Sequence, residues 1–116
     1  MSRKKLGEWG EKKAFKYLKD KGFKILEKNY RVKIGEIDII AKKDNYIVFV
    51  EVKTRKSLKY GNPEYAVNRH KQDKIKKVAE LYLLKNNYYD KNIRFDVITI
   101  IIDRGKSKLN HIRAAF

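Results

Sequence analysis

Cysteine is absent from this chain of 116 residues, and proline occurs once, at Pro63. The lack of cysteine excludes disulfide bonds, thiolate zinc sites and cysteine nucleophiles. No apolar run reaches the roughly 18 residues of a membrane-spanning helix, and no apolar segment of a signal peptide follows the first basic residues. The sequence also lacks internal repeats and Pro-, Gly- or Ser-rich linkers. We therefore expect one domain over residues 1–116, in the cytoplasm and without a membrane partner.

Acidic residues are few beside basic ones: 14 Asp and Glu stand against 30 Lys and Arg, a net charge of +16. Such a charge repels itself in the compact state, and a polyanionic partner is the usual compensation. Nucleic acid is the predicted partner. An anionic membrane surface and a Lys-rich composition without functional meaning are the alternatives. The hydrophobic fraction of 42% is sufficient for one core, and its grouping into clear runs argues against disorder.

Hydrophobic periodicity predicts two helices and four strands. The first helix should end at Gly22, a residue that favours helix C-termini. The order helix, three strands, helix, strand indicates a mixed α/β fold, with one sheet and helices packed on it. The expected helices cover residues 4–21 and 68–84, the strands cover 23–30, 36–42, 46–55 and 95–102, a basic loop covers 56–61, and a short apolar tail covers 111–116.

Carboxylates interrupt two of the apolar strands. Asp38 precedes Ile39-Ile40, and Glu51 follows four apolar residues, 47–50. A charge buried in such a strand costs several kcal/mol or more unless it is paired, so these acids need an explanation.

Strand arithmetic predicts that these two acids meet. A two-residue turn at 44–45 closes the hairpin and places Asp38 opposite Glu51 and Glu36 opposite Lys53. The repulsion between Asp38 and Glu51 then requires an offset, and a bound Mg²⁺ would supply it, because Mg²⁺ prefers oxygen ligands. A solvated strand face with ordinary Glu–Lys neighbours is the alternative.

A third acid, Glu11, falls within the apolar arc of the first helix, in a row with Phe15 and Leu18. It would face the hairpin as a metal ligand or a group that positions water. Alternatively, it is a core-edge glutamate that pairs with a lysine or whose stem covers apolar surface.

Basic residues flank this predicted site. Lys71 and Gln72 fall inside the apolar arc of the second helix, where they would approach a phosphate. Snorkelling of the lysine to solvent is the alternative. The basic loop mixes cations with an aromatic residue, which suits a nucleic-acid backbone, although a solvated loop would have the same composition. Its predicted contact residues are Arg55, Lys56, Lys59 and Tyr60.

The remaining polar residues of interest are interpreted as structural. His70 and His111 lack the spacing of metal ligands. Asp96 begins a strong strand, and we expect it to pair with Arg94 or a backbone donor.

Six segments together resemble the YraN family of small bacterial proteins, for which a restriction-endonuclease-like fold is predicted. They are Trp9-Gly10-Glu11, Gly35-Glu36-Ile37-Asp38, residues 48–53, the helix around Lys71, Arg94-Phe95-Asp96-Val97 and residues 111–116. The resemblance covers nearly the whole chain. More distantly, the chain is similar to archaeal Holliday-junction resolvases, whose core has the same order of helices and strands.

The resemblance implies a restriction-endonuclease-like core and a Mg²⁺- or Mn²⁺-dependent endonuclease acting on DNA, with structured or branched DNA as the expected substrate. The positions that match the active-site motif are Asp38, Glu51, Lys53 and Glu11. Lys71 and Gln72 match a supporting position on the second helix. Because junction resolvases usually act as symmetric dimers, the resemblance also favours a homodimer. The main alternative is a non-catalytic nucleic-acid-binding module on the same fold, and an assembly or ribosome-associated factor is less favoured.

Overall fold

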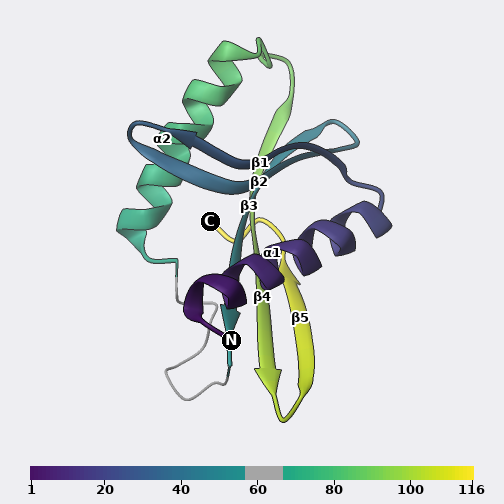
Figure 1. Cartoon of the computed structure of the whole chain (residues 1–116). Coiled ribbons are helices and arrows are strands. Elements are labelled where there is room, and N and C mark those ends of the chain that lie inside the picture. Colours follow the sequence, from purple (N-terminus) through teal and green to yellow (C-terminus); the bar gives the residue numbers. More distant parts are fainter. Residues whose placement is uncertain (57–66) are drawn as a thin grey trace.

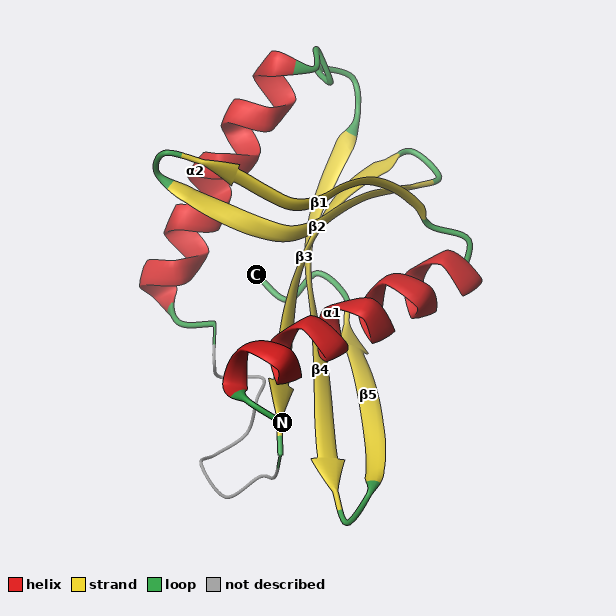
Figure 2. Cartoon of the chain, in the orientation of Figure 1, coloured by secondary structure: helices red, strands yellow, loops and turns green. Residues whose placement is uncertain are grey.

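The computed structural model describes residues 1–56 and 67–116, which form two helices and one five-stranded sheet (Figures 1 and 2). The predicted order of helix, three strands, helix and strand is confirmed, and a fifth strand follows. The elements are α1 (Arg3–Asp20), β1 (Lys24–Val32), β2 (Gly35–Lys43), β3 (Tyr46–Arg55), α2 (Arg69–Lys85), β4 (Asn92–Asp103) and β5 (Lys106–Ile112). No helix in these two ranges is long and apolar enough to cross a membrane.

Local capping explains where the helices begin and end. The hydroxyl of Ser2 accepts a hydrogen bond from the Lys5 N–H at 3.1 Å, and the side chain of Asn68 accepts one from the Lys71 N–H at 3.0 Å. Both residues satisfy amides that have no partner within the helix. Gly22 adopts a φ of +89° just after α1, so the predicted stop is observed and depends on the left-handed freedom of glycine.

The strands lie in chain order, β1-β2-β3-β4-β5, and the sheet is mixed. Neighbouring strands are antiparallel except β3 and β4, which run parallel. A parallel pair needs a long crossover connection, and α2 lies within that connection.

The two helices use opposite faces of the sheet. Along β3, Ile47 and Phe49 pack in the cluster that includes α2, whereas Val48 and Val50 pack in the cluster that includes α1. This alternation follows from the period of two residues in a strand. Close contact between α1 and β3 also requires Gly10, because a Cβ at this position would lie 1.8 Å from Oγ1 of Thr54.

Strand β5 was not predicted, and only its last two residues, 111 and 112, belong to the predicted apolar tail. A turn at 104–105, with φ values of +51° at Arg104 and +77° at Gly105, joins it to β4. Its sequence, Lys-Ser-Lys-Leu-Asn-His-Ile, contains few apolar residues, so hydrophobic patterning predicts it weakly. The strand forms because β4 offers an open edge, with which it pairs from Asp103↔Lys106 to Val97↔Ile112.

Asp96 is fully buried and anchors the C-terminal segment, which confirms the structural role expected beside Arg94. Its carboxylate accepts hydrogen bonds from Arg94 at 2.9 and 3.0 Å, from Nε2 of His111 at 2.7 Å and from the Ala114 N–H at 3.0 Å. The other ring nitrogen of His111, Nδ1, lies 3.0 Å from the Tyr17 hydroxyl. Burial alone would raise the pKa of Asp96, but these hydrogen bonds outweigh it and hold the pKa below its usual value.

Candidate active site

The β2–β3 hairpin has the register predicted from its turn. Lys43 pairs with Tyr46 across the two-residue turn, and the ladder continues in the same register to Ile39 and Val50. Asp44 makes the turn with a left-handed φ of +54°, a conformation that Asp tolerates better than most residues. Continuing this register by one residue brings Asp38 level with Glu51.

Backbone pairing between β2 and β3 ends one level earlier, at Ile39 and Val50. Beyond it, the two carboxylates accept hydrogen bonds from backbone amides of the opposite strand. The Val52 N–H donates a hydrogen bond to Oδ2 of Asp38 at 2.8 Å. The Asp38 N–H points to Oε1 of Glu51 at a longer 3.4 Å. Each acid therefore satisfies an amide of the opposite strand, which explains how both are tolerated at the end of an apolar hairpin.

Burial strongly affects the charge of this pair. Glu51 is 9% exposed, and burial, reinforced by the nearby Asp38, raises its pKa to about 8. Burial also raises the pKa of Asp38, although the Val52 N–H and the Lys53 ammonium oppose that change. Two ionised carboxylates are thus unfavourable here without additional positive charge.

Lys53 supplies part of that charge from the same strand. It is half-buried, and both burial and the adjacent Lys71 lower its pKa, while the attraction of Glu51 and Asp38 opposes the shift. A lysine with a lowered pKa beside two acids with raised pKa values is typical of functional sites.

Glu11 reaches the same region from α1. Its Oε1 atom is buried and has no hydrogen-bond partner among the described residues. Burial, followed by repulsion from Asp38, Glu36 and Glu8, raises the pKa of Glu11 to about 7. An unsatisfied buried oxygen needs an explanation in a folded protein. Within residues 1–56 and 67–116, no lysine bonds to this oxygen.

These side chains line one open cavity of about 260 Å³ between α1, the ends of β2 and β3, and α2. The structure therefore brings together four of the predicted site residues and places Lys71 beside them. The residues that provide the charged groups are Glu11, Glu36, Asp38, Glu51, Lys53, Lys71 and Lys74.

The two supporting residues on the second helix take different positions. Lys71 is exposed at the rim of the cavity, close enough to Lys53 to lower its pKa. Gln72 donates from Nε2 to the Val67 carbonyl at 3.0 Å, so its amide secures the chain before α2.

Glu36 does not pair with Lys53. Instead, it accepts a 2.8 Å hydrogen bond from Arg31 of β1, its partner across the β1–β2 ladder.

The basic loop is described only at its start. Arg55 ends β3 and is partly exposed, and Lys56 is exposed. Lys59 and Tyr60 lie outside the described residues.

The acids fit a magnesium ion only as a partial ligand set. Within residues 1–56 and 67–116, no three Asp, Glu, His or Cys side chains converge closely enough to hold a metal by themselves. Mg²⁺, however, is commonly held by one or two carboxylates together with water and substrate phosphate. Asp38 and Glu51 meet that requirement, and the unpartnered oxygen of Glu11 is a further oxygen donor facing the same cavity.

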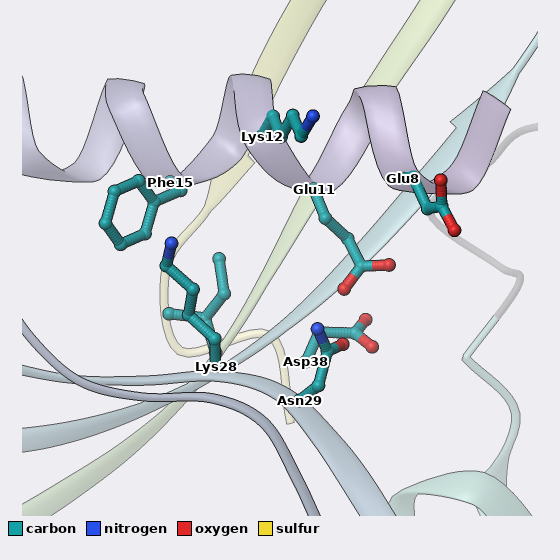
Figure 3. A pocket seen from close by; sticks show the side chains of 8 residues that line it. Glu8, Glu11, Lys12, Phe15, Lys28, Asn29 and Asp38 are labelled. Atoms are coloured by element: carbon teal, nitrogen blue, oxygen red, sulfur yellow. The ribbon is translucent and has the colours of Figure 1, made fainter. Parts of the chain in front are cut away.

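A second cavity, of about 230 Å³, lies between α1 and the β1–β2 hairpin and was not predicted (Figure 3). Glu11 and Asp38 line both cavities. Phe15, Lys28 and Asn29 line the second cavity but not the first. The one sequence signal for it is Asn29, because asparagine inside a strand tolerates the left-handed conformation that interrupts pairing.

Comparison with known sequences identifies close relatives. The sequence profile of the uncharacterised protein family UPF0102 matches residues 10–100. A UPF0102 protein of Syntrophomonas wolfei is 50% identical over 113 residues, which cover 97% of this chain and 98% of the relative. A UPF0102 protein of Clostridioides difficile is 52% identical over 116 residues, covering both chains completely. Another, from Thermodesulfovibrio yellowstonii, is 52% identical over 118 residues, covering 100% of this chain and 99% of the relative.

Proposed function

The chain belongs to the uncharacterised protein family UPF0102, also known as YraN, and we propose that it is a metal-dependent endonuclease that hydrolyses phosphodiester bonds in DNA. Structured or branched DNA is the proposed substrate. The observation that carries this proposal is the convergence of Asp38, Glu51, Lys53 and Glu11 on one cavity. The net charge of +16 supports a polyanionic substrate.

In this proposal Asp38 and Glu51 hold Mg²⁺ or Mn²⁺, and Glu11 contributes a third oxygen or holds a water molecule. The bound metal would polarise the phosphate and lower the pKa of a water molecule. Lys53 orients the attacking water or stabilises the charge that develops on the phosphate oxygens. Lys71, at the rim, holds the incoming phosphate.

The raised pKa values support the need for a cation. A divalent ion favours the ionised form of each carboxylate, so it would reverse the effect of burial on Asp38 and Glu51. Metal binding would release protons near neutral pH and weaken as the pH falls.

The wider surface suits binding that does not depend on sequence. Lys71 and Lys74 of α2 line the cavity beside Lys53, and contacts of lysine with phosphate are strongly salt-dependent. The proposed recognition is of DNA shape. A homodimer, which would present two such sites to a branched substrate, is part of the proposal.

A non-catalytic nucleic-acid-binding module is the second candidate. The carboxylates of Asp38 and Glu51 already accept backbone amides that hold the ends of β2 and β3. This gives both acids a structural use that needs no metal.

A cleavage assay distinguishes the two candidates. The protein is incubated with Mg²⁺ or Mn²⁺ and four-way junctions, flaps, single strands or duplexes, beside Asp38→Asn and Lys53→Ala variants. Asp44→Asn, which changes an acid at the other end of the same hairpin, is the matched control. The nuclease proposal expects cleavage by wild type and the control only. Binding without cleavage, or cleavage that survives in both site variants, would contradict it.

A further inference from the structure

The cavity between α1 and the β1–β2 hairpin results from a break in strand pairing. The ladder pairs Lys28 with Ile39 and Tyr30 with Ile37 but skips the intervening level, where Asn29 faces Asp38. Asn29 has a φ of +49°. Asp38 therefore lies outside regular pairing with both β1 and β3, and the opening beside it is a built feature of the sheet.

One wall of this cavity is aromatic. Phe15 projects from α1, and Nζ of Lys28 lies 3.6 Å from the centre of its ring (Figure 3). Ile39 adds an apolar surface. The Lys28 ammonium therefore covers one face of the Phe15 ring, and a planar group that stacks on this face takes the place of the cation, which is then available to an adjacent negative charge.

The opposite wall carries hydrogen-bonding groups. The Glu11 side chain extends from α1 toward Asp38, with Asn29 beside them (Figure 3). The unpartnered Oε1 of Glu11 is buried, and the Asn29 amide offers both donors and an acceptor. This combination matches the edge of a nucleobase, which also presents donors and acceptors in one plane.

Size and position suggest how the two cavities work together. At about 230 Å³, this cavity is smaller than the roughly 300–1,000 Å³ pockets that bind drug-sized ligands, which suits one base. Because Glu11 and Asp38 line both cavities, a base bound here would lie next to a phosphate bound beside Lys53.

We propose that the cavity lined by Phe15, Lys28 and Asn29 is a binding site for a single unstacked nucleobase, adjacent to the phosphate that the acid–lysine cavity receives. This inference rests on the proposed function and narrows its substrate to DNA with unpaired nucleotides, such as single strands, flaps or opened junctions. Unpaired bases are favoured because turning a base out of a duplex costs unstacking and unpairing energy.

The test compares binding of two fluorescent single strands of equal length and charge, one intact and one with abasic central nucleotides, in EDTA so that no metal-dependent cleavage occurs. Stacking of one base on an aromatic side chain is expected to strengthen binding about tenfold. Phe15→Leu and Asn29→Ala should reduce this preference to about twofold or less. Trp9→Leu is the matched control, because Trp9 also packs against the α1-side core but does not line the cavity.

Equal binding of both strands by wild type, or a tenfold preference that survives Phe15→Leu, would overturn the base site. A second measurement places the base directly: a strand with 5-iodouracil, irradiated in the complex, should crosslink to the segments around residues 15 and 28–29. Crosslinks confined to other segments would contradict the proposal. The outcome is separable from that of the nuclease assay. A base preference without cleavage would contradict only the nuclease proposal. Cleavage without a base preference would contradict only the proposed base site.

Discussion

The backbone N–H of Val52 donates a 2.8 Å hydrogen bond to Oδ2 of Asp38, one residue beyond the last backbone pair of β2 and β3. A carboxylate thus takes the place of a carbonyl at the end of the hairpin. The same acid contacts the amide of β3, faces Glu11 and lines both cavities. This position makes Asp38 the first residue on which the proposals can be tested.

Mg²⁺ should stabilise the wild-type protein and not the Asp38→Asn variant. A ligand at ten times its dissociation constant stabilises the folded state by about 1.4 kcal/mol, which raises the melting temperature by roughly 5–7 °C in a domain of this size. Asparagine can still accept the Val52 N–H, so the variant should fold. Thermal unfolding with and without Mg²⁺ measures the difference, and the Asp44→Asn control should respond like wild type. An unchanged melting temperature in wild type would count against the metal site.

Without metal, stability should fall as the pH rises from about 4.5 to 8. The pKa of Glu51 is raised to about 8 and that of Glu11 to about 7, so the folded state retains protons that the unfolded chain has already lost. Unfolding free energy then decreases with pH across that interval and levels off above it. Denaturant unfolding at pH 5.5 and 8.5 should differ by more than about 1 kcal/mol. Glu51→Gln should reduce this difference, and a variant with the wild-type pH dependence would contradict the assignment.

Asp96→Asn should destabilise the protein by roughly 2–4 kcal/mol, because it leaves the charge of Arg94 and the ring of His111 without their buried partner. The lowered pKa of Asp96 adds a pH signature. Its stabilising contribution is present above the unfolded pKa of 3.8 and is lost as the pH falls through the lower folded value. Chemical unfolding at pH 7 and acid titration measure both effects. Asp103→Asn, at the exposed end of the same strand, should change stability by less than about 0.5 kcal/mol.

Gly10→Ala and Gly7→Ala should have opposite effects, although both lie in α1. A Cβ at Gly10 would overlap Thr54, whereas one at Gly7 meets nothing within 4 Å. We expect Gly10→Ala to cost about 1–3 kcal/mol through overpacking and Gly7→Ala to gain about 0.5–1 kcal/mol in helix propensity. Adding Thr54→Ala to Gly10→Ala should restore part of the loss. Equal effects of the two alanine substitutions would show that α1 does not depend on this contact.

Local signals in the sequence were sufficient for much of the fold. The continuous apolar run at 47–50 identified β3, because a strand that packs on both faces has no alternation of apolar and polar residues. The two-residue turn set the hairpin register, because each opposed pair follows from the one before it. The apolar arc of α1 placed Glu11 toward the sheet for the same reason, since a helix repeats regularly. Strand β5 was not predictable in this way, because it depends on the open edge of β4.

The sequence by itself therefore determined the order of the elements, the hairpin register and which acids would lie near one another, because turn length and side-chain period are local properties. Only the tertiary structure decided what those acids contact. The close approach of α1 through Gly10, the separation of the strands at Asp38 and the break at Asn29 all arise when distant segments pack together. Packing left one oxygen of Glu11 without a partner in the part of the chain that the structure describes, and it opened a second cavity. No periodic pattern in the chain encodes either.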